Sequence, residues 1–243
     1  WVFIKFKAGA DPTWRHAVLS ASGHVSPTGG ALSPVVDLRG AFVLRNTDGI
    51  GNVNYTGVQL RWNYGASGVA DNDVIEVRVL AVEMVLVPQA AFLAGDGTGS
   101  DIQRNFSAGT NDPPLTIGSE AALTLGGTAS TSLGNHNNVD SGSGTDDDFN
   151  ASTTQVLPAA FPKGFNAFYM MKYECTEGQY VDFLNMLTVQ QASNRFPNTT
   201  GTLGNTMDDT GVAPELYVTS APDRAASVRG SDMLAYADWA ALR

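Results

Sequence analysis

The sequence has few of the residue types on which catalytic and metal-binding sites depend. Its 243 residues include one cysteine, Cys175, and three histidines. A single cysteine excludes an internal disulfide and every zinc site built from cysteine ligands. The histidines lie in separate segments, at His16, His24 and His136, without the spacing of a metal site. No G-x-S-x-G nucleophile motif and no glycine-rich phosphate loop occurs, so the sequence assigns no catalytic or cofactor-binding residue.

Positive charge is also scarce. The chain carries 14 Lys and Arg against 24 Asp and Glu, which gives a net charge of -10, and its pI is about 4.5. Because binding to a phosphate backbone needs a basic face, nucleic acid is not expected as a partner. No apolar run approaches the roughly 18 residues that would indicate a membrane span. The 43% hydrophobic content and 26 glycines predict a globular, loop-rich protein with much β structure.

Residues 1–88 have the pattern of several short strands. The run at residues 1–7 places Val2, Ile4 and Phe6 on one face of a strand, apolar residues alternate with polar ones along residues 58–64, and a valine-rich run covers residues 73–87. Turn residues separate these segments, which is typical of an all-β sandwich or small barrel. The prediction is therefore a β-sandwich domain over residues 1–88, followed directly by a second domain over residues 89–243.

The composition changes sharply at residues 126–154, which contain almost no apolar residues. Such a segment cannot bury enough surface to offset its ordering entropy, so we expect a long surface insertion. This insertion and a shorter acidic loop near residue 100 offer carboxylates to a cation. Calcium, which prefers oxygen ligands, is the metal that such carboxylates would suit. The candidate ligands are Asp96, Asp101, Asp146, Asp147 and Asp148.

A strand-like run followed by a capped helix occupies residues 168–187. Thr176 and Gln179 have the T-x-x-Q spacing of a capping box, in which each side chain binds a free backbone amide of the first turn. Apolar residues then recur at the spacing of one helix face, which predicts a helix over residues 177–187 with a buried stripe. The predicted core residues of that stripe are Tyr180, Phe183, Leu184 and Leu187.

Two further helices are expected after the first. Thr188 and Gln191 repeat the T-x-x-Q spacing and predict a second, short helix. Ser231 and Asp232 are suited to cap a final helix over residues 232–242.

Three segments resemble the formylglycine-generating enzyme family, also called the sulfatase-modifying-factor family. MKYECTEGQYVDFLN at residues 171–185 is similar to the family's KYEVTNAQYAAFLN. EMVLVPQAAFLAG at residues 83–95 and SDMLAYADWAALR at residues 231–243 are similar to its MVxVPGGTFxMG and DALAYCNWxGKR. The resemblance implies a variant of the C-type-lectin fold over residues 89–243, incomplete at its C-terminal end. The expected class is mainly β with an α+β part.

The resemblance does not bring the family's catalytic residues with it. Oxidase members of the family bind copper through two cysteines, and other relatives bind iron through a histidine triad; neither set can be assigned to residues of this chain. Cys175 stands where the family has Val in YEVT, which implies a side chain facing the core. A buried thiol behaves as a small hydrophobe and stays protonated.

These observations favour a non-catalytic extracellular module, structural or adhesive, within a larger surface protein or an assembly such as a filament. Its partners would be other proteins or copies of itself, with contacts through the β domain and the loops at residues 126–154 and 197–214. One alternative is a formylglycine-generating-type oxidase whose catalytic cysteines lie beyond residue 243. A second is a lectin-like module that binds glycans or proteins. The expected location is extracellular or at the cell surface, as for a secreted bacterial protein.

Overall fold

The structure is a computed structural model that describes residues 1–47, 49–95, 106–109, 113–134, 154–197 and 204–242. The chain forms two compact units: the first comprises Trp1–Met84 and Met171–Arg243, and the second Val85–Met170. This division differs from the expected boundary after residue 88, because the N-terminal strands and the helices belong to the same unit. Strands make up 32% of the structure and helices are few, which confirms the mainly β class.

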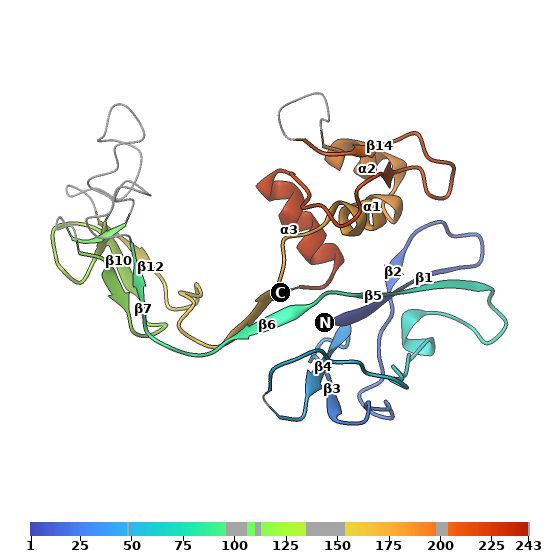
Figure 1. Ribbon diagram of the computed structural model, residues 1–243, viewed down its shortest axis with the longest axis horizontal. Helices are drawn as coiled ribbons and strands as arrows, with labels where there is room; N and C mark the ends of the chain where they lie inside the picture. Colours follow the sequence, from blue (N-terminus) through green and yellow to red (C-terminus); the bar gives the residue numbers. More distant parts are fainter. Residues whose placement is uncertain (48, 96–105, 110–112, 135–153, 198–203, 243) are drawn as a thin grey trace. The chain divides into compact units, whose positions relative to one another are not determined.

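The first unit contains an antiparallel five-stranded sheet centred on β1 (Val2–Ala8). One side of β1 pairs along its whole length with β5 (Ile75–Ala81). The other side pairs with β2 (Arg15–His16) and with β4 (Gly40–Arg45), and β4 also pairs with β3 (Gly30–Pro34) (Figure 1). The described strands before Met84 therefore form one sheet, where the sequence predicted the two sheets of a sandwich.

The expected strand at residues 58–64 is replaced by an irregular segment. Only two isolated bridges form there, Leu19 with Trp62 and Val25 with Gln59. The hydroxyl of Ser67 accepts hydrogen bonds from the Val18 amide at 3.0 Å and the Trp62 indole at 2.9 Å. Backbone hydrogen bonds join it to residues 18–25 at these two bridges alone, so this segment covers the sheet without becoming a second sheet. A single 3-10 turn, η1 (Gly65–Ser67), follows it.

Successive residues of β1 point to opposite faces of the sheet. Ile4 and Phe6 lie in a small core beneath the irregular segment. Phe3 lies in a larger core that includes the helices, with its ring 5.3 Å from that of Trp239. On the same side, the Trp1 indole donates a hydrogen bond of 2.7 Å to the Ala240 carbonyl. The N-terminal strand and the last helix thus share one interior.

Two of the three helices have the predicted caps. α1 (Glu177–Asn185) begins with the Thr176 and Gln179 capping box, and α2 (Val189–Arg195) begins with that of Thr188 and Gln191. In each box the hydroxyl accepts from the amide three residues on, and the glutamine accepts from the threonine amide. Both capping predictions are confirmed.

The third helix, α3 (Gly230–Trp239), differs from its predicted bounds of 232–242. It starts after Arg229, and no side chain caps it. Its end is fixed by Ala241, which has a left-handed φ of 54°. The Leu242 amide then donates back to the Ala237 carbonyl. This is a Schellman-type C-terminus, which stops the helix before Ala241.

The helices bury most of the predicted stripe of α1. Tyr180, Phe183 and Leu184 are buried, whereas Leu187 is only partly buried because α1 ends at Asn185. Met186 is buried at that point. Rings from α1 and α3 pack edge to face, with 5.8 Å between the centroids of Phe183 and Tyr236. A short hairpin of β14 (Met207–Asp208) and β15 (Val218–Thr219) completes this unit.

The second unit contains short strands around a small core of Ala108, Leu115 and Ile117. β6 (Met84–Val87) pairs with β13 (Phe168–Met171), and β7 (Phe92–Ala94) pairs with β9 (Leu115–Ile117). A four-stranded sheet has the order β12 (Thr154–Leu157), β10 (Leu123–Gly126), β11 (Leu133–Gly134) and β8 (Ser107–Ala108). None of the helices in the described part of the chain has the length and apolar character needed to cross a bilayer.

Candidate functional site

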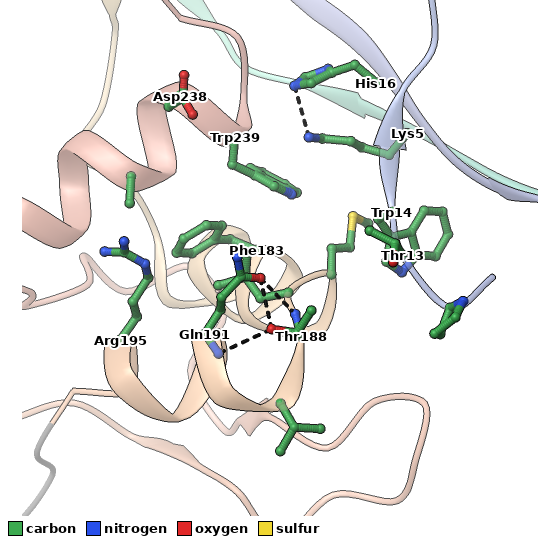
Figure 2. Close-up of a pocket in the computed structure, with 15 residues that line it drawn as sticks. Lys5, Thr13, Trp14, His16, Phe183, Thr188, Gln191, Arg195, Asp238 and Trp239 are labelled. Carbon is green, nitrogen blue, oxygen red and sulfur yellow. Dashed lines mark hydrogen bonds between the residues drawn. The ribbon is translucent and has the colours of Figure 1, made fainter. Parts of the chain in front are cut away.

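A cavity of about 640 Å³ lies in the first unit, beside the ends of α1 and α3. We call it the indole pocket, because two tryptophans line it. Its apolar lining includes Trp14, Phe183, Met186, Leu187, Val189 and Trp239. Its polar lining includes Lys5, His16, Thr188, Gln191, Arg195 and Asp238 (Figure 2). An apolar cavity with a few converging polar groups is the usual form of a small-molecule site.

Lys5 and His16 form the polar centre of the indole pocket. The Lys5 side chain is almost fully buried, and its Nζ lies 2.9 Å from Nε2 of His16. The same ammonium lies 5.3 Å from the ring centroid of Trp239, and Figure 2 shows the three side chains facing one another. Burial lowers the pKa of Lys5 to about 7, against the opposing field of Asp238. Burial, with the nearby Lys5 and Arg39 charges, lowers the pKa of His16 to about 4.

A second cavity, of about 510 Å³, adjoins the first through shared lining residues. Lys5, Trp14 and His16 border both cavities. The second cavity adds the guanidinium groups of Arg15 and Arg39. Most of the charged side chains that line the two cavities are therefore cationic, whereas the chain as a whole has a net charge of -10.

The outer edge of β5 is a different kind of candidate. In the described part of the chain, β5 pairs with β1 alone. The Gly9 amide donates to the Val74 carbonyl, and the Val82 amide donates to the Trp1 carbonyl. Backbone groups of alternate residues point to opposite sides of a strand, so the even-numbered residues face β1. The residues that present their amides and carbonyls to the free edge are Ile75, Val77, Val79 and Ala81.

The opposite edge of the sheet, on β3, is closed by local bonds. The Gly30 amide donates to the Pro27 carbonyl at 3.1 Å. The Leu32 amide donates to the Ser26 hydroxyl, also at 3.1 Å. Pro34, the next residue facing outward, has no amide hydrogen. The outward groups of β3 are thus protected, whereas no local bond in the described part of the chain closes those of β5.

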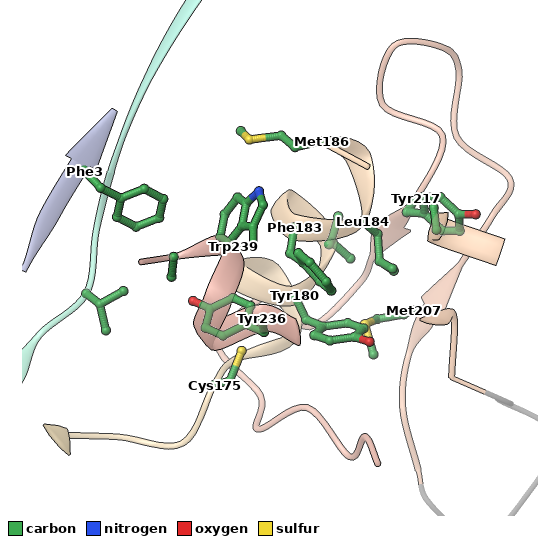
Figure 3. Packing of buried hydrophobic residues seen from close by; sticks show 14 of the residues in the cluster. Phe3, Cys175, Tyr180, Phe183, Leu184, Met186, Met207, Tyr217, Tyr236 and Trp239 are labelled. Atoms are coloured by element: carbon green, nitrogen blue, oxygen red, sulfur yellow. The ribbon is translucent and has the colours of Figure 1, made fainter. Parts of the chain in front are cut away.

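Cys175 is part of the core and not of either candidate site. It is buried, and its thiol lies 3.6 Å from the Thr176 carbonyl oxygen and points toward Tyr236 (Figure 3). Burial raises the pKa of the thiol to about 12. A thiol that stays protonated at neutral pH is a poor nucleophile and a poor metal ligand.

The predicted calcium ligands lie outside the described residues. Asp96, Asp101, Asp146, Asp147 and Asp148 belong to the segments 96–105 and 135–153, and most of the insertion at 126–154 lies there too. Within the described ranges, no group of three or more His, Cys, Asp or Glu side chains is arranged to hold a metal ion. The calcium prediction stays a prediction.

Glu177 is a buried charged residue that the sequence interpretation missed. It is the first residue of α1, and its carboxylate accepts hydrogen bonds of 2.6 Å from the hydroxyls of both Thr206 and Thr219. Although burial raises the pKa of Glu177, these bonds and the nearby Arg224 outweigh it and hold the pKa below its usual value. The signal was present in the sequence, because residue 177 lies three positions before Tyr180 on the buried stripe.

No family model matches the chain, and no significant match is found among the curated proteins or the solved structures. Function therefore has to be argued from the two candidate sites. The indole pocket offers hydrogen-bond donors and aromatic surface, which suit binding. The β5 edge offers unpaired backbone groups, which suit strand pairing.

Proposed function

We propose that the chain is a non-catalytic structural or adhesive module of an extracellular surface protein, and that it assembles by pairing β5 with β5 of a second copy. The observation that carries this proposal is the free edge of β5. Three of its exposed side chains, Ile75, Val77 and Val79, are apolar, and Val79 is 64% exposed. A long, apolar, unprotected edge is a template for pairing with another chain.

The register of such a pair follows from the backbone. A two-fold axis through Val77 would place Val77 opposite its own copy and Ile75 opposite Val79. These are the residues whose amides and carbonyls point to the free edge. Each opposed pair could then exchange two hydrogen bonds, as antiparallel strands require.

The side chains are self-complementary in the same register. On one face, Val77 would meet Val77 and Ile75 would meet Val79 of the second copy, all in apolar pairs. On the other face, Glu76 would lie opposite Arg78 of the second copy. Opposite charges in directly opposed positions of two strands stabilise the pairing. A single strand therefore supplies both halves of a symmetric interface, as a two-fold dimer needs.

The closed edge on β3 limits how far this pairing can go. A sheet with two open edges can grow without end, whereas among the described residues local bonds close the β3 edge of this sheet. Pairing through β5 would join two copies and leave a β3 edge at each end. Larger assembly would have to use other surfaces, such as the loops expected to make contacts.

The proposal is tested by measuring the mass of the native protein in solution against concentration. We expect a dimer that dissociates on dilution. Val77→Pro removes an outward-facing amide and leaves the β1 ladder intact, so it should give a folded monomer. Val77→Thr retains the amide and the strand propensity, and it should remain dimeric.

Two outcomes would overturn the proposal. One is a wild-type protein that stays monomeric at every concentration. The other is a Val77→Pro variant that dimerises as well as the wild type. If Val77→Pro fails to fold, as judged by circular dichroism, Val79→Lys blocks the same edge with a charge and should also be monomeric.

We further propose that residues 83–243 are related in fold to the formylglycine-generating enzyme family. Support comes from contacts among the three similar segments. β6 pairs with β13, and Lys172 Nζ lies 2.6 Å from a carboxylate oxygen of Glu83. The Phe183 ring packs against Tyr236. The oxidase alternative would need thiols other than Cys175; conversion of a cysteine-containing sulfatase peptide to the aldehyde by the native polypeptide would establish it and overturn the non-catalytic role.

A second candidate function is a lectin-like binding module. The indole pocket favours it, because two tryptophan rings and several hydrogen-bond donors face one cavity. Tryptophan combines a large apolar surface with a polar edge, which suits ligands of mixed character.

A further inference from the structure

We propose that the indole pocket and its adjoining cavity bind an organic anion: a carboxylate carried on a ring, with the carboxylate at Lys5 and the ring against the indoles of Trp14 and Trp239. This refines the lectin-like candidate function and is independent of pairing through β5. Three features favour such a ligand: the two indole surfaces, the cationic groups that line the cavities, and the buried donors without partners.

The charge around the two cavities contrasts with the charge of the chain. Lys5, Arg15, Arg39 and Arg195 line them, against the carboxylate of Asp238. The chain as a whole has 14 Lys and Arg and 24 Asp and Glu. A local excess of cations in an acidic protein concentrates anions at one place and repels them elsewhere.

Lys5 can bind an anion without giving up its present contacts. An ammonium has three N–H donors and no acceptor. One donor reaches His16 Nε2, which can accept because burial keeps that imidazole neutral. Lys5 lines both cavities, so its remaining donors can reach a ligand from either side. A charge-assisted bond to a carboxylate is about twice as strong as a neutral one.

Besides Nδ1 of His16, two buried donors beside Lys5 have no acceptor among the described residues. They are the indole Nε1 of Trp239 and Nε of Arg15. Each borders one of the two cavities. Buried donors without partners are costly, and a ligand rich in acceptors would satisfy them. A cationic ligand would add donors to a site that already has too many.

The ring surfaces are held rigidly. The Trp239 indole packs against Phe3 at 5.3 Å and Phe183 at 5.5 Å between centroids. Trp14 is held by cations, with Lys7 Nζ at 4.7 Å and the Arg78 guanidinium at 5.8 Å from its ring. A fixed aromatic wall binds a flat or ring-shaped body with little loss of side-chain entropy. The cavity of about 640 Å³ has room for one such ring and its substituents.

Protonation of Lys5 should control the binding. The groups that face it are His16, Arg39 and Asp238, with the Trp239 ring. Burial lowers the pKa of Lys5 to about 7, so the ammonium is present below that pH and is lost above it. A carboxylate binds the charged form. Affinity should therefore fall at least about tenfold between about pH 6 and about pH 9.

Titration of the native protein with four probes tests the proposal, with tryptophan fluorescence and calorimetry as readouts. The carboxylates are glucuronic acid and 4-hydroxyphenylacetate, and their neutral partners are glucose and 4-hydroxyphenylacetamide. We expect at least one carboxylate to bind with a dissociation constant of about 1 mM or tighter, and its neutral partner to bind at least about tenfold more weakly. Binding of glucuronic acid alone identifies an acidic sugar, and binding of 4-hydroxyphenylacetate alone an aromatic acid.

Three variants distinguish binding in the indole pocket from non-specific attraction of an anion to positive charge. Lys5→Met keeps the apolar stem and should weaken binding about tenfold or more. Trp239→Phe keeps a ring but lacks the N–H, and should weaken it about three- to tenfold. Lys172→Met, remote from the pocket, should change nothing. Failure of both carboxylates to bind the wild type, equal binding of the neutral partners, or equal loss in Lys172→Met and Lys5→Met would overturn the proposal. None of these results would bear on pairing through β5.

Discussion

Two paired strands, β1 and β5, differ in how much of their surface is covered. Ile4 of β1 and Val79 of β5 lie directly opposite each other on the same face. Ile4 is 6% exposed, because the segment bearing Leu19 and Trp62 lies over it. Val79 is 64% exposed, because that segment does not reach β5. Burial is thus decided by what covers a strand and not by the pattern of the strand itself.

The other face of the same two strands is covered by the helices. Phe3 and its register partner Leu80 both contribute to the core that contains Phe183 and Trp239. Covered positions should therefore govern the free energy of unfolding, and exposed positions on β5 should govern association. Substitutions at covered and at exposed positions should therefore differ in their effect on the free energy of unfolding.

Phe183→Ala should have the largest effect, because its ring contacts Tyr180, Tyr236 and Trp239 in the buried core. We expect a loss of about 3–5 kcal/mol, from lost transfer free energy and the cavity that remains. Denaturant unfolding measures it. Tyr173→Ala, an exposed aromatic position, serves as the control and should cost less than about 1 kcal/mol. A similar loss in the two variants would mean that ring burial does not set stability.

Glu177→Gln should lower the free energy of unfolding by about 1.5–3 kcal/mol near neutral pH, because it weakens charge-assisted bonds from Thr206 and Thr219. The pKa of Glu177 is lowered from its ordinary value of 4.5. Its contribution is therefore present above that value and is lost as pH falls through the folded-state pKa. The gap between wild type and variant should shrink from about pH 7 to about pH 3. Glu83→Gln, an exposed pair with Lys172, should show no such gap.

Cys175→Ser should cost about 1–2 kcal/mol, because a hydroxyl is more costly to bury than a thiol. With the pKa of the thiol raised to about 12 by burial, a thiol reagent should label native Cys175 slowly and unfolded Cys175 rapidly. Mass spectrometry of the labelled protein measures both rates. Equal rates in the two states would place the thiol at the surface.

The smallest effects are expected at the opposed pair of Ile4, which is covered, and Val79, which is exposed. Ile4→Val removes one methylene from a covered site and should cost about 0.5–1.5 kcal/mol. Val79→Thr changes the opposed, exposed residue and should alter stability by less than about 0.5 kcal/mol. Measured on the monomeric Val77→Pro background, these two values exclude any contribution from association. A larger loss for Val79→Thr would show that β5 is covered in solution by another part of the chain.

The features that the sequence predicted correctly depend on nearby residues. Both capping boxes join residues three positions apart, and the stripe of Tyr180, Phe183 and Leu184 follows from the helical repeat. Leu187 departs from the stripe because the helix ends first, at Asn185. Element type in these segments is a local property, so a single sequence contains it.

The features that the sequence could not predict depend on residues far apart. The valine alternation of β5 is the same for a covered strand and an exposed one, so pattern alone could not show that Val79 is exposed. The partnership of Lys5 with His16 needs the pairing of β1 with β2, and both residues resemble ordinary surface positions in the sequence. The boundary expected after residue 88 differs from the observed division because Phe3 and Trp239 share a core.

The hydrogen bond from the Trp1 indole to Ala240 has a consequence for synthesis of the protein. The two residues are 239 positions apart. A ribosome adds about 5–20 residues per second, so the N-terminal strand waits roughly 10–50 s for the helix that covers it. During that interval the nascent sheet exposes Phe3 and Leu80 on the face that α3 later covers. The open edge of β5 is exposed as well. These strands are therefore most exposed to aggregation before α3 leaves the ribosome, and a chaperone that holds apolar strands would act in that interval.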